Sequence, residues 1–264
     1  MEYVLITGGA SGMGRATALK LANEGYHVFS CDIKKAEESE NITQLEVDVT
    51  NMESVQKAFA KVCEITDKLC GVFNFAGIIM MNSLIEISEE DFVKIFNINL
   101  FGAYRINKTF FPLVQKGNGK IIITTSELAP NKILPFNAIY AISKKSLDAY
   151  AQGLTMELGL LDIPVVTLRP GAVETPILVD SNKEMAALND NTELYKNTIT
   201  KFKSIVDKEQ GGAIPPSKIA ELVLKILRKK KPKHIYKKNI SKKLKLLNLC
   251  STKLQLKLLK MILK

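Results

Sequence analysis

Short apolar runs recur along the chain, and they predict β-strands that are buried on both faces of a sheet. The runs lie at Tyr3–Ile6, His27–Cys31, Gln44–Val47, Gly71–Phe75, Lys120–Thr124, Ile163–Leu168 and, more weakly, Lys233–Tyr236. Most are separated by stretches of helical length in which apolar residues return every three or four positions, namely Gly14–Asn23, Ser54–Glu64, Asp91–Val114 and Tyr140–Leu158. This alternation predicts a single α/β domain of the Rossmann type, with a doubly wound parallel sheet and helices on both of its faces.

One segment, residues 176–214, interrupts the alternation. It is polar and mixed in composition, with scattered apolar residues at Leu178, Met185, Leu188, Tyr195 and Phe202. A long insertion at the carboxyl end of a strand is usually functional, so we expect a lid or a wall of a substrate site; the alternative is a surface loop without such a role. We expect a dinucleotide-binding and catalytic domain at residues 1–238, which includes this insertion, and an amphipathic C-terminal tail at residues 239–264.

The positive charge of the chain is concentrated near its C-terminus. The 264 residues include 37 Lys or Arg and 27 Asp or Glu, a formal net charge of +10. Residues 228–264 contain 14 of the basic residues and no acidic residue, which leaves 23 basic and 27 acidic residues, or −4, in residues 1–227. Basicity is therefore a property of one segment, and we expect no nucleic-acid binding by the domain.

The tail alternates lysine with leucine in a pattern that predicts an amphipathic helix. On a helix Lys253, Lys257, Lys260 and Lys264 form a stripe, and the remainder is covered by Leu254, Leu256, Leu258, Leu259, Met261, Ile262 and Leu263. The lysines interrupt the apolar residues too often for a membrane span. Two interpretations remain open: the helix lies in an anionic membrane surface, or it packs on the domain or a second subunit with its lysines in water.

The beginning of the chain and its cysteines bear on the compartment. Met1 is followed almost at once by the first apolar run, without the regions of a signal peptide, so we expect a cytoplasmic protein. Contact with the inner face of the membrane through residues 239–264 is an alternative location. The cysteines, at Cys31, Cys63, Cys70 and Cys250, have neither CxxC spacing nor nearby histidines, and we expect neither a metal site nor disulfides.

The first apolar run ends in a glycine-rich turn, Thr7-Gly8-Gly9-Ala10-Ser11-Gly12-Met13-Gly14, and a helical pattern follows. Glycines allow the backbone to turn tightly and approach a pyrophosphate, which the N-terminus of the helix then stabilises. Asp32 ends the next strand 18 residues after Gly14, near the distance at which an acid meets the ribose hydroxyls. Because a 2′-phosphate beside Asp32 would bring like charges together, we expect NAD rather than NADP. The nearby Lys34 and Lys35 weigh in the opposite direction, since their positive charges would attract such a phosphate.

Tyr140 and Lys144 lie one turn apart on the same face of a predicted helix. Oxidation of an alcohol requires removal of its proton, and free tyrosine, with a pKa of about 10, is a poor base at neutral pH. A nearby ammonium and the positive nicotinamide ring both favour the phenolate, and a drop in its pKa of roughly three units is equivalent to about 4 kcal/mol; we expect Lys144 to supply the ammonium. Ser126, after a predicted strand, would hold the substrate oxygen against the phenol. Tyr104 and Lys108 have the same spacing without this context, and we expect Tyr104 to be a core or interface residue.

These motifs, in this order, resemble the short-chain dehydrogenase/reductase superfamily from Thr7 to about Tyr236, with the TGxxxGxG pattern at the glycine-rich turn. The resemblance implies that Asn99 completes a catalytic tetrad with Tyr140, Lys144 and Ser126 and supports a water-linked proton relay. The cofactor contacts that it implies are Thr7, Gly8, Ser11, Gly12, Met13, Gly14, Asp32, Asp48, Val49, Asn74, Ala76, Gly77, Tyr140, Lys144, Pro170, Gly171, Val173 and Thr175. It also implies dimers or tetramers, packed through the helices that begin near Asn97 and Tyr140.

Some of these contacts have specific implied roles. Asp48 and Val49 resemble the family's adenine contact, although an aspartate here could instead cap the following helix. Val173 and Thr175 would hold the nicotinamide carboxamide. Ser11 stands where relatives that use NADP often carry a basic residue, which again favours NAD.

Two features depart from the family pattern. Phe75 replaces an asparagine that the family carries after the fourth strand. Ser126 and Tyr140 are 14 residues apart, one more than is typical, and we attribute the difference to a longer loop at Glu127–Ile139. The loop length affects the expected shape of the substrate site and leaves the expected reaction unchanged.

The sequence therefore predicts an NAD-dependent oxidoreductase that interconverts a secondary alcohol and a ketone, with Tyr140 as general acid and base. The tail and the insertion favour a lipophilic small molecule as substrate, of a steroid-like, retinoid-like or acyl class. One alternative is a 3-oxoacyl reductase, which Asp32 disfavours because such enzymes generally use NADPH. The other is a non-catalytic dinucleotide-sensing or membrane-associated binding protein, which the intact candidate catalytic set disfavours.

Overall fold

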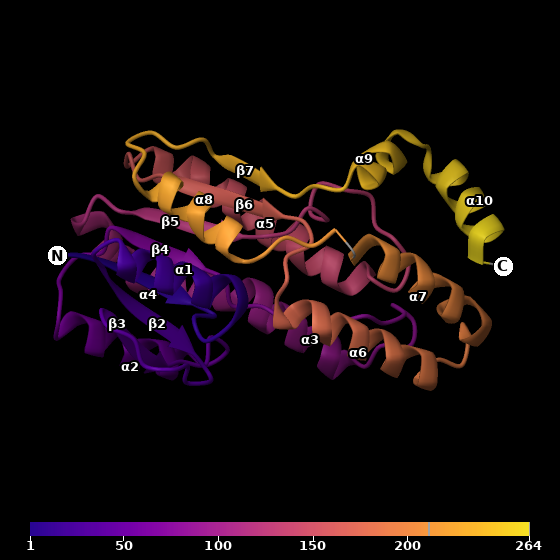
Figure 1. The fold of residues 1–264 in the computed structure, drawn as a ribbon, viewed down its shortest axis with the longest axis horizontal. Helices are drawn as coiled ribbons and strands as arrows, with labels where there is room; N and C mark the ends of the chain where they lie inside the picture. Colours follow the sequence, from indigo (N-terminus) through magenta and orange to yellow (C-terminus); the bar gives the residue numbers. More distant parts are fainter. Residues whose placement is uncertain (211, 264) are drawn as a thin grey trace.

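A parallel sheet forms the centre of the molecule in a computed structural model, which describes residues 1–210 and 212–263. The sheet has seven strands in the order β3-β2-β1-β4-β5-β6-β7, and every neighbouring pair is parallel (Figure 1). The strands are β1 (Glu2–Thr7), β2 (Tyr26–Asp32), β3 (Ile42–Glu46), β4 (Gly71–Asn74), β5 (Lys120–Thr124), β6 (Val165–Pro170) and β7 (Ile235–Lys238). Because the strand order reverses between β1 and β4, a crevice for ligands is expected at their carboxyl ends.

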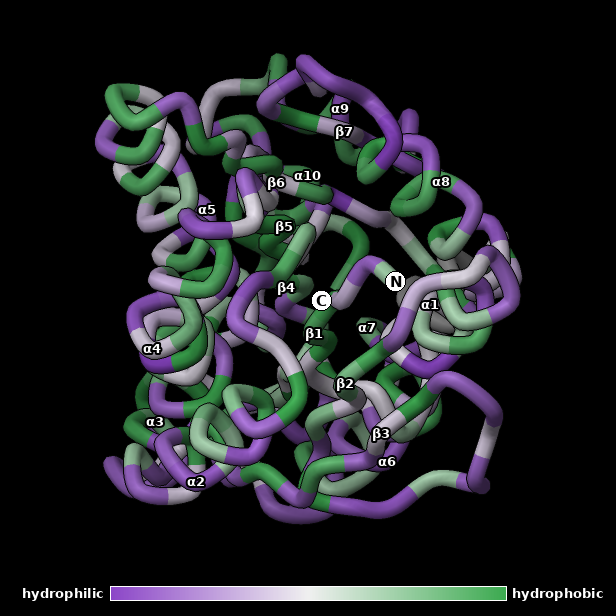
Figure 2. Tube along the Cα trace, turned by 90° about the vertical axis from the view of Figure 1, so that its left-hand side faces the viewer, coloured by the Kyte–Doolittle hydropathy of each residue, from purple (hydrophilic) through white to green (hydrophobic). Residues whose placement is uncertain are grey.

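Helices cover both faces of the sheet. The helices on one face are α2 (Met52–Cys63), α4 (Ala103–Lys116) and α5 (Ala138–Gly159), and those on the other are α1 (Gly12–Asn23) and α8 (Ser217–Leu227). Figure 2 shows strands that are largely hydrophobic between helices with hydrophilic stretches. The remaining helices are α3 (Glu89–Phe96), the π-helical turn η1 (Asn97–Gly102), α6 (Pro176–Asn191), α7 (Lys196–Gln210), α9 (Lys242–Leu249) and α10 (Thr252–Leu263).

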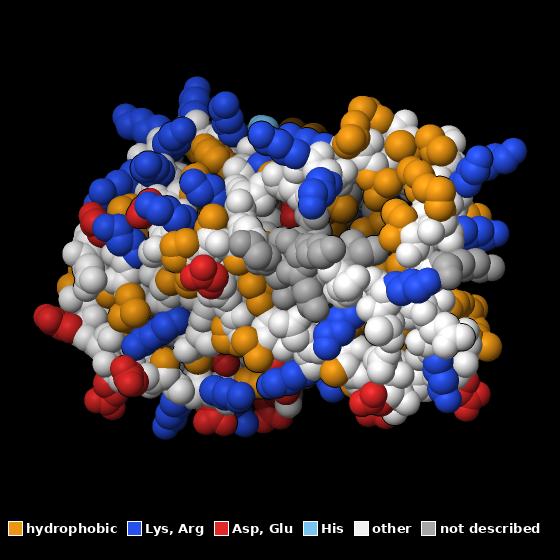
Figure 3. Space-filling model, turned by 45° about the vertical axis from the view of Figure 1, so that its right-hand side comes forward, with side chains coloured by type: hydrophobic (Ala, Val, Ile, Leu, Met, Phe, Trp, Pro, Cys, Tyr) orange, Lys and Arg blue, Asp and Glu red, His pale blue; other side chains and the backbone are white. Residues whose placement is uncertain are grey.

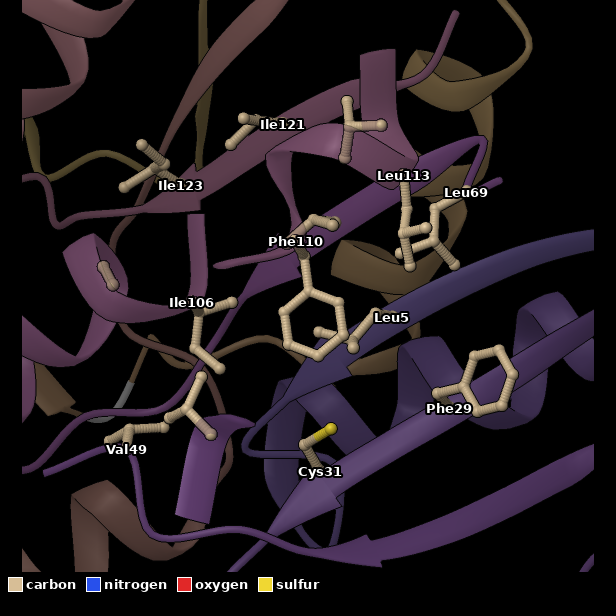
Figure 4. Packing of buried hydrophobic residues seen from close by; sticks show 14 of the residues in the cluster. Leu5, Phe29, Cys31, Val49, Leu69, Ile106, Phe110, Leu113, Ile121 and Ile123 are labelled. Carbon is tan, nitrogen blue, oxygen red and sulfur yellow. The ribbon is translucent and has the colours of Figure 1, made fainter. Parts of the chain in front are cut away.

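Alternation along the central strand divides the core into two layers. In β1, Leu5 packs into the layer under α2, α4 and α5, whereas Val4 and Ile6 pack into the layer under α1 and α8. In the first layer Leu5 lies near Phe110 of α4 (Figure 4), and both side chains are fully buried. Burial of one such side chain stabilises the fold by about 1.5–3 kcal/mol, so the sheet is a rigid support for residues at its carboxyl edge.

The predicted strands and the predicted fold class are confirmed. The strand at Lys120–Thr124 has the predicted bounds, and the last strand is shifted by two residues, to Ile235–Lys238. The predicted helix Asp91–Val114 is instead three consecutive elements, α3, η1 and α4. The π-helical turn separates the two α-helices because its hydrogen bonds span an additional residue, and such turns are frequent at functional sites.

The insertion and the tail are helical and pack on each other. Residues 176–214 contain α6 and α7, and α10 lies against α7 at the end of the molecule opposite the N-terminus (Figure 1). Phe202 of α7, Leu263 of α10 and Phe136 belong to one small buried cluster. Packing on the domain is thus observed for one face of the tail. Lys264, the last member of the predicted lysine stripe, lies outside the described residues, and none of the described helices is long and apolar enough to cross a membrane.

Candidate active site

The glycine-rich turn joins β1 to α1 by a route that only glycine permits. Gly8 and Gly12 have φ angles of 69° and 53°, in the left-handed region. A Cβ atom on Gly14 would lie 2.0 Å from the carbonyl oxygen of Gly8, so a side chain there would force loop and helix apart. The Ser11 side chain makes no capping hydrogen bond, which leaves the first amides of α1 available to an anion. The turn therefore fits a pyrophosphate.

Asp32 is held at the edge of this turn by two backbone amides. Its Oδ2 accepts a hydrogen bond from Ala10 N at 3.0 Å, and its Oδ1 accepts one from Lys34 N at 3.1 Å. The carboxylate is therefore fixed at the carboxyl end of β2 beside the glycine-rich turn. Such a position suits an acceptor for ribose hydroxyls.

A cleft of about 360 Å³ gathers most of the predicted cofactor contacts. The predicted residues that line it are Gly8, Ser11, Gly12, Met13, Gly14, Asp32, Asp48, Val49, Ala76, Gly77 and Thr175. Pro170, Gly171 and Val173 line an adjoining pocket, which Thr175 also borders. The two cavities meet at Met13, at Phe75 just after β4 and at the segment after β6, so a ligand long enough to fill the cleft would reach the pocket. This arrangement fits an extended dinucleotide.

Two predicted contacts support the cleft from behind. Thr7 is buried, and its hydroxyl accepts a hydrogen bond from Ala76 N at 3.2 Å. The Asn74 side chain donates to Asn107 Oδ1 at 2.8 Å, which ties β4 to α4. Neither residue is among those that line the cleft, so both act on its shape through their neighbours.

The two interpretations of Asp48 are separated by its partners. Asp48 Oδ1 accepts hydrogen bonds from the backbone amide and the hydroxyl of Thr50, at 2.8 and 2.7 Å. The N-cap of α2 is Asn51, whose side chain accepts from Glu53 N and Ser54 N. Asp48 thus shapes the loop at the cleft, and the capping role belongs to Asn51.

Three candidate catalytic residues converge where the pocket meets the sheet. Tyr140 and Lys144 are buried on one face of α5, and Ser126 follows β5. Lys144 Nζ donates to the carbonyl oxygen of Thr124 at 3.2 Å and lies 6.0 Å from the centre of the Tyr140 ring. The Ser126 hydroxyl hydrogen-bonds with the Tyr140 phenol. All three residues line the pocket.

Burial shifts both titratable groups toward their neutral forms. It raises the pKa of Tyr140 to about 12, an effect that the hydrogen bond with Ser126 partly offsets. It lowers the pKa of Lys144 to about 8. Burial of the phenol therefore sets the direction of the Tyr140 pKa shift in the protein by itself, and the expected drop, which also depends on the positive nicotinamide ring, stays a prediction. Further positive charge at the phenol is needed to favour the phenolate.

The π-helical turn places Asn99 beside Lys144. Asn99 Oδ1 accepts from Ile78 N at 2.8 Å, and its Nδ2 donates to Ile78 O and to Ser143 Oγ, both at 3.0 Å. A Cβ atom on Gly77 would lie 3.0 Å from Asn99 Oδ1 and 3.4 Å from Lys144 Nζ. Asn99 thus connects the segment after β4 to α5, and the proton relay expected from it stays a prediction.

The adjoining pocket has a volume of about 490 Å³ and a largely apolar wall. The insertion contributes Ile177, Leu178 and Phe202 to this wall, and its role in binding a substrate stays a prediction. Apolar residues from other segments are Met13, Phe75, Ile79, Met81, Leu128, Leu134, Ile240 and Leu244. Ile240 and Leu244 belong to the tail, whose part in the site the sequence did not indicate. Their positions depend on where the tail packs, and no local pattern reveals that.

Sequence reasoning also missed two acids that hold the loop around Ser126. Asp148 receives hydrogen bonds from Arg169 Nε at 2.8 Å and from the Thr125 hydroxyl at 3.0 Å. Glu127 Oε2 accepts from Ser241 N at 2.6 Å, which ties this loop to the tail. Both acids lie next to a motif residue in space or in sequence, but charged residues at such places are common, so neither acid has a distinctive signal in the sequence.

Comparisons with known proteins agree with this geometry. Residues 2–186 match the family model of the short chain dehydrogenases. The chain is 28% identical to a 3-ketodihydrosphingosine reductase of Bacteroides thetaiotaomicron, over 88% of this chain and 85% of the relative. It is 31% identical to an NADPH-dependent 1-acyldihydroxyacetone phosphate reductase of Schizosaccharomyces pombe, over 77% of this chain and 74% of the relative.

A solved structure gives the same picture. An alcohol dehydrogenase of the archaeon Thermococcus sibiricus, in complex with 5-hydroxy-NADP, superposes with a TM-score of 0.70 at 25% identity. The superposition covers 90% of this chain and 95% of the archaeal one.

Proposed function

The chain belongs to the short-chain dehydrogenase family and is an oxidoreductase that acts on alcohol or keto groups, and on this premise we propose that it uses NAD on a lipophilic substrate. The observation that carries the proposal is the meeting of Tyr140, Ser126 and Lys144 at an apolar pocket that adjoins the dinucleotide cleft. Hydride transfer requires the substrate carbon to lie between these two cavities.

The proton chemistry belongs to Tyr140. In oxidation the phenolate takes the proton of the substrate hydroxyl, and in reduction the phenol returns a proton to the keto oxygen. Ser126 donates a hydrogen bond to the same oxygen and holds it near the phenol. When bound, the nicotinamide ring accepts or supplies the hydride.

Lys144 supplies positive charge close to the phenol. Its pKa of about 8 leaves it largely protonated at neutral pH, so it favours the phenolate, as does an oxidised nicotinamide. Its bond to the Thr124 carbonyl fixes the ammonium between β5 and α5. Asn99 holds the neighbouring part of α5 in place, because it bonds to the Ile78 backbone and to Ser143, the residue before Lys144.

The preference for NAD rests on Asp32. The carboxylate is fixed by Ala10 N and Lys34 N, so it cannot easily turn away from a 2′-phosphate. The carboxylate and a neighbouring 2′-phosphate would repel each other strongly in a partly desolvated cleft. The S. pombe relative is named as NADPH-dependent, which makes cofactor preference the part of the proposal most in need of a direct measurement.

The shape and the lining of the pocket support a lipophilic substrate. A cavity of about 490 Å³ with an apolar wall accommodates an extended hydrocarbon or a ring system better than a small sugar. The names of the two relatives specify a sphingoid and an acyl substrate, respectively. We therefore propose a keto or hydroxy compound that carries an acyl chain, with its oxygen at Ser126 and Tyr140.

Turnover by matched tyrosine variants tests the reaction. Purified protein is assayed for NADH formation and consumption with lipophilic secondary alcohols and ketones, with NADP in parallel. Tyr140→Phe should lower kcat by roughly 100- to 10,000-fold and leave NAD binding intact, because it removes only the proton-transfer group. Tyr104→Phe is the control, since Tyr104 has a lysine partner at the same spacing, Lys108 at 3.1 Å, on the surface.

The results of this assay distinguish the proposed enzyme from a dinucleotide-sensing protein. Equal activity of Tyr140→Phe and the unaltered protein would contradict the proposed mechanism. Binding of NAD without turnover of any compound would favour the dinucleotide-sensing alternative.

A further inference from the structure

The outer side of α10 carries two parallel stripes of opposite character. Leu254 and Met261 are exposed and form, with the half-buried Leu258 between them, an apolar stripe at spacings of four and three residues, which Ile262 extends. Lys253, Lys257 and Lys260 have the same spacing, one residue earlier, and form an exposed basic stripe beside it. Met261 is 72% exposed and Ile262 is 52% exposed. The helix therefore presents leucine, isoleucine and methionine side chains to water along a row of ammonium groups.

Helix α9 continues the same pattern. Its exposed residues Lys242, Lys245, Leu246 and Leu249 share one side of the helix at spacings of three and four. Leu246 is 68% exposed and Leu249 is 82% exposed. Figure 3 shows hydrophobic side chains gathered at this end of the molecule, with lysines around them. We call the exposed residues of α9 and α10 together the tail face.

The other side of the tail is fixed to the domain, so the tail face is held in a defined place. Leu263 and Leu259 of α10 pack into the cluster around Phe202 of α7. Asn248 of α9 accepts a hydrogen bond from Lys132 N at 2.7 Å. The exposed apolar residues are therefore left over after packing on the domain is complete.

The charge of the tail face selects among partners. Residues 228–264 contain no acidic residue, so every charged side chain of the tail face is cationic. An interface between two copies through this face would bring lysine rows toward each other, which repulsion disfavours. An anionic lipid surface satisfies both stripes, because the leucines enter the acyl boundary and the lysines meet the headgroups.

We propose that the tail face docks on an anionic lipid bilayer and that the substrate pocket opens beside the docked surface. Ile240, Lys242 and Leu244 line the pocket and also begin the tail, so the pocket mouth and the tail face are continuous. A lipophilic substrate then passes from the bilayer into the pocket with little exposure to water. Docking goes beyond the proposed reaction and is measurable without turnover, whereas the transfer of substrate rests on the proposed function.

Vesicle binding by matched variants of the full chain tests the docking. Sedimentation is measured with vesicles of phosphatidylcholine alone and of phosphatidylcholine mixed with phosphatidylserine. The unaltered protein should bind the mixed vesicles and should be released as salt is raised. Substitution of Lys253, Lys257 and Lys260 by Gln should lower partitioning by on the order of a hundredfold at low salt. The control replaces Lys229, Lys230 and Lys231, exposed at the other end of β7, and should change partitioning by less than about threefold.

The apolar stripe has its own pair of variants. Leu249→Glu should lower partitioning by about tenfold or more, because it removes a leucine from the acyl boundary. Leu160→Glu introduces the same change at a leucine that is 87% exposed at the end of α5, and it should leave binding unchanged. All substituted side chains are exposed, and thermal unfolding verifies that each variant folds.

Three results would overturn the proposal. The first is equal binding of the unaltered protein to both kinds of vesicle. The second is an equal loss of vesicle partitioning when either set of three lysines is replaced. The third is self-association that depends on concentration and is abolished by Leu249→Glu, while vesicle binding is absent. A bound protein that turns over no lipophilic compound would retain the docking and reject only the proposed reaction.

Discussion

The cofactor end and the substrate end of this active site are built in different ways. At the cofactor end the cleft is lined by the segments at the carboxyl ends of β1, β2, β3, β4 and β6, and the turn between β1 and α1 owes its shape to left-handed glycines and a close crossing at Gly14. At the substrate end the wall comes from the loop after β5, the helices α6 and α7 and the tail, which are distant in sequence. The first end rests on the sheet core, and the second rests on a small cluster around Phe136 and Phe202.

The difference separates general chemistry from selectivity. Hydride and proton transfer require fixed positions within fractions of an ångström, and the sheet core provides them. The choice of substrate requires only a wall of suitable shape, which helices attached to the edge of the domain can provide. Substitutions should therefore have large, global effects at the cofactor end and smaller, local effects at the substrate end.

The largest expected effect is that of Gly14→Ala. Its Cβ atom would meet the Gly8 carbonyl at 2.0 Å, so the turn must open. We expect at least about a hundredfold weaker NAD binding and a stability loss of about 1–3 kcal/mol. Gly153→Ala is the control, because nothing lies within 4 Å of its Cβ position in α5, and it should stabilise the protein by about 0.5–1 kcal/mol. Calorimetric titration with NAD and thermal unfolding measure both; unchanged NAD affinity in Gly14→Ala would refute the steric argument.

Lys144→Met should sharpen the comparison by revealing a stability cost where the sheet core meets the substrate pocket. The pKa of Lys144 is about 8 in the folded protein, below its ordinary 10.5. Below pH 8 the lysine is protonated in both states and burial of the charge disfavours folding; from pH 8 to 10.5 the folded state loses its proton first and the cost disappears. Lys144→Met should therefore be more stable than the unaltered protein by about 3 kcal/mol at pH 7, by less as pH rises, and inactive.

Urea unfolding at pH 7 and pH 10 measures this effect. Lys108→Met, at an exposed lysine with the same spacing from a tyrosine, is the control for the loss of a lysine as such. A Lys144→Met protein that is less stable at pH 7 would mean that its bond to Thr124 outweighs the burial of charge.

Asp32→Asn should change cofactor preference without changing the fold. The substitution keeps a side-chain acceptor for Ala10 N or Lys34 N and removes the negative charge. We expect the ratio of kcat/KM for NAD over NADP to fall by at least about tenfold, or roughly 1.4 kcal/mol. Asp48→Asn, in the same cleft, should affect both cofactors alike. An unaltered protein that already prefers NADP would show that Asp32 does not decide the preference.

The smallest expected effect lies at the substrate end. Leu259→Ala removes part of a half-buried contact in the cluster under α10 and should cost about 1 kcal/mol locally. Hydrogen exchange should accelerate in α10 while the amides of β1 keep their protection, because α10 opens without the sheet. Equal acceleration in α10 and β1 would show that the tail unfolds together with the core. It would contradict the distinction between a substrate end that opens locally and a cofactor end that rests on the sheet.

The fold was predictable because parallel strands buried on two faces appear as continuous apolar runs. The split of the helix at Asp91–Val114 was not, because the π-helical turn at Asn97–Gly102 leaves the helical spacing of apolar residues largely intact. Residues 176–214 did not read as helices, because their apolar positions are few and contact other inserted segments rather than the sheet.

The candidate site was predictable where backbone sterics determine it and unpredictable where distant segments meet. The glycine-rich turn and Asp32 have local signals in their spacing. Glu127 and Ile240 have none, because their roles arise only when the tail lies on the loop after β5. The burial that raises the Tyr140 pKa has no local signal for a related reason, since burial depends on tertiary packing that spacing cannot show.

The order of the strands in the sheet also matches the order in which the ribosome makes them. β1, β2 and β3 are made first and lie side by side, and β4 to β7 then add one after another on the other side of β1. On a ribosome, which adds roughly 5–20 residues per second, each new strand finds an edge that has already been made. The residues of the dinucleotide cleft are all translated before the tail that completes the substrate pocket, so the nascent chain acquires the general part of its site before the selective part.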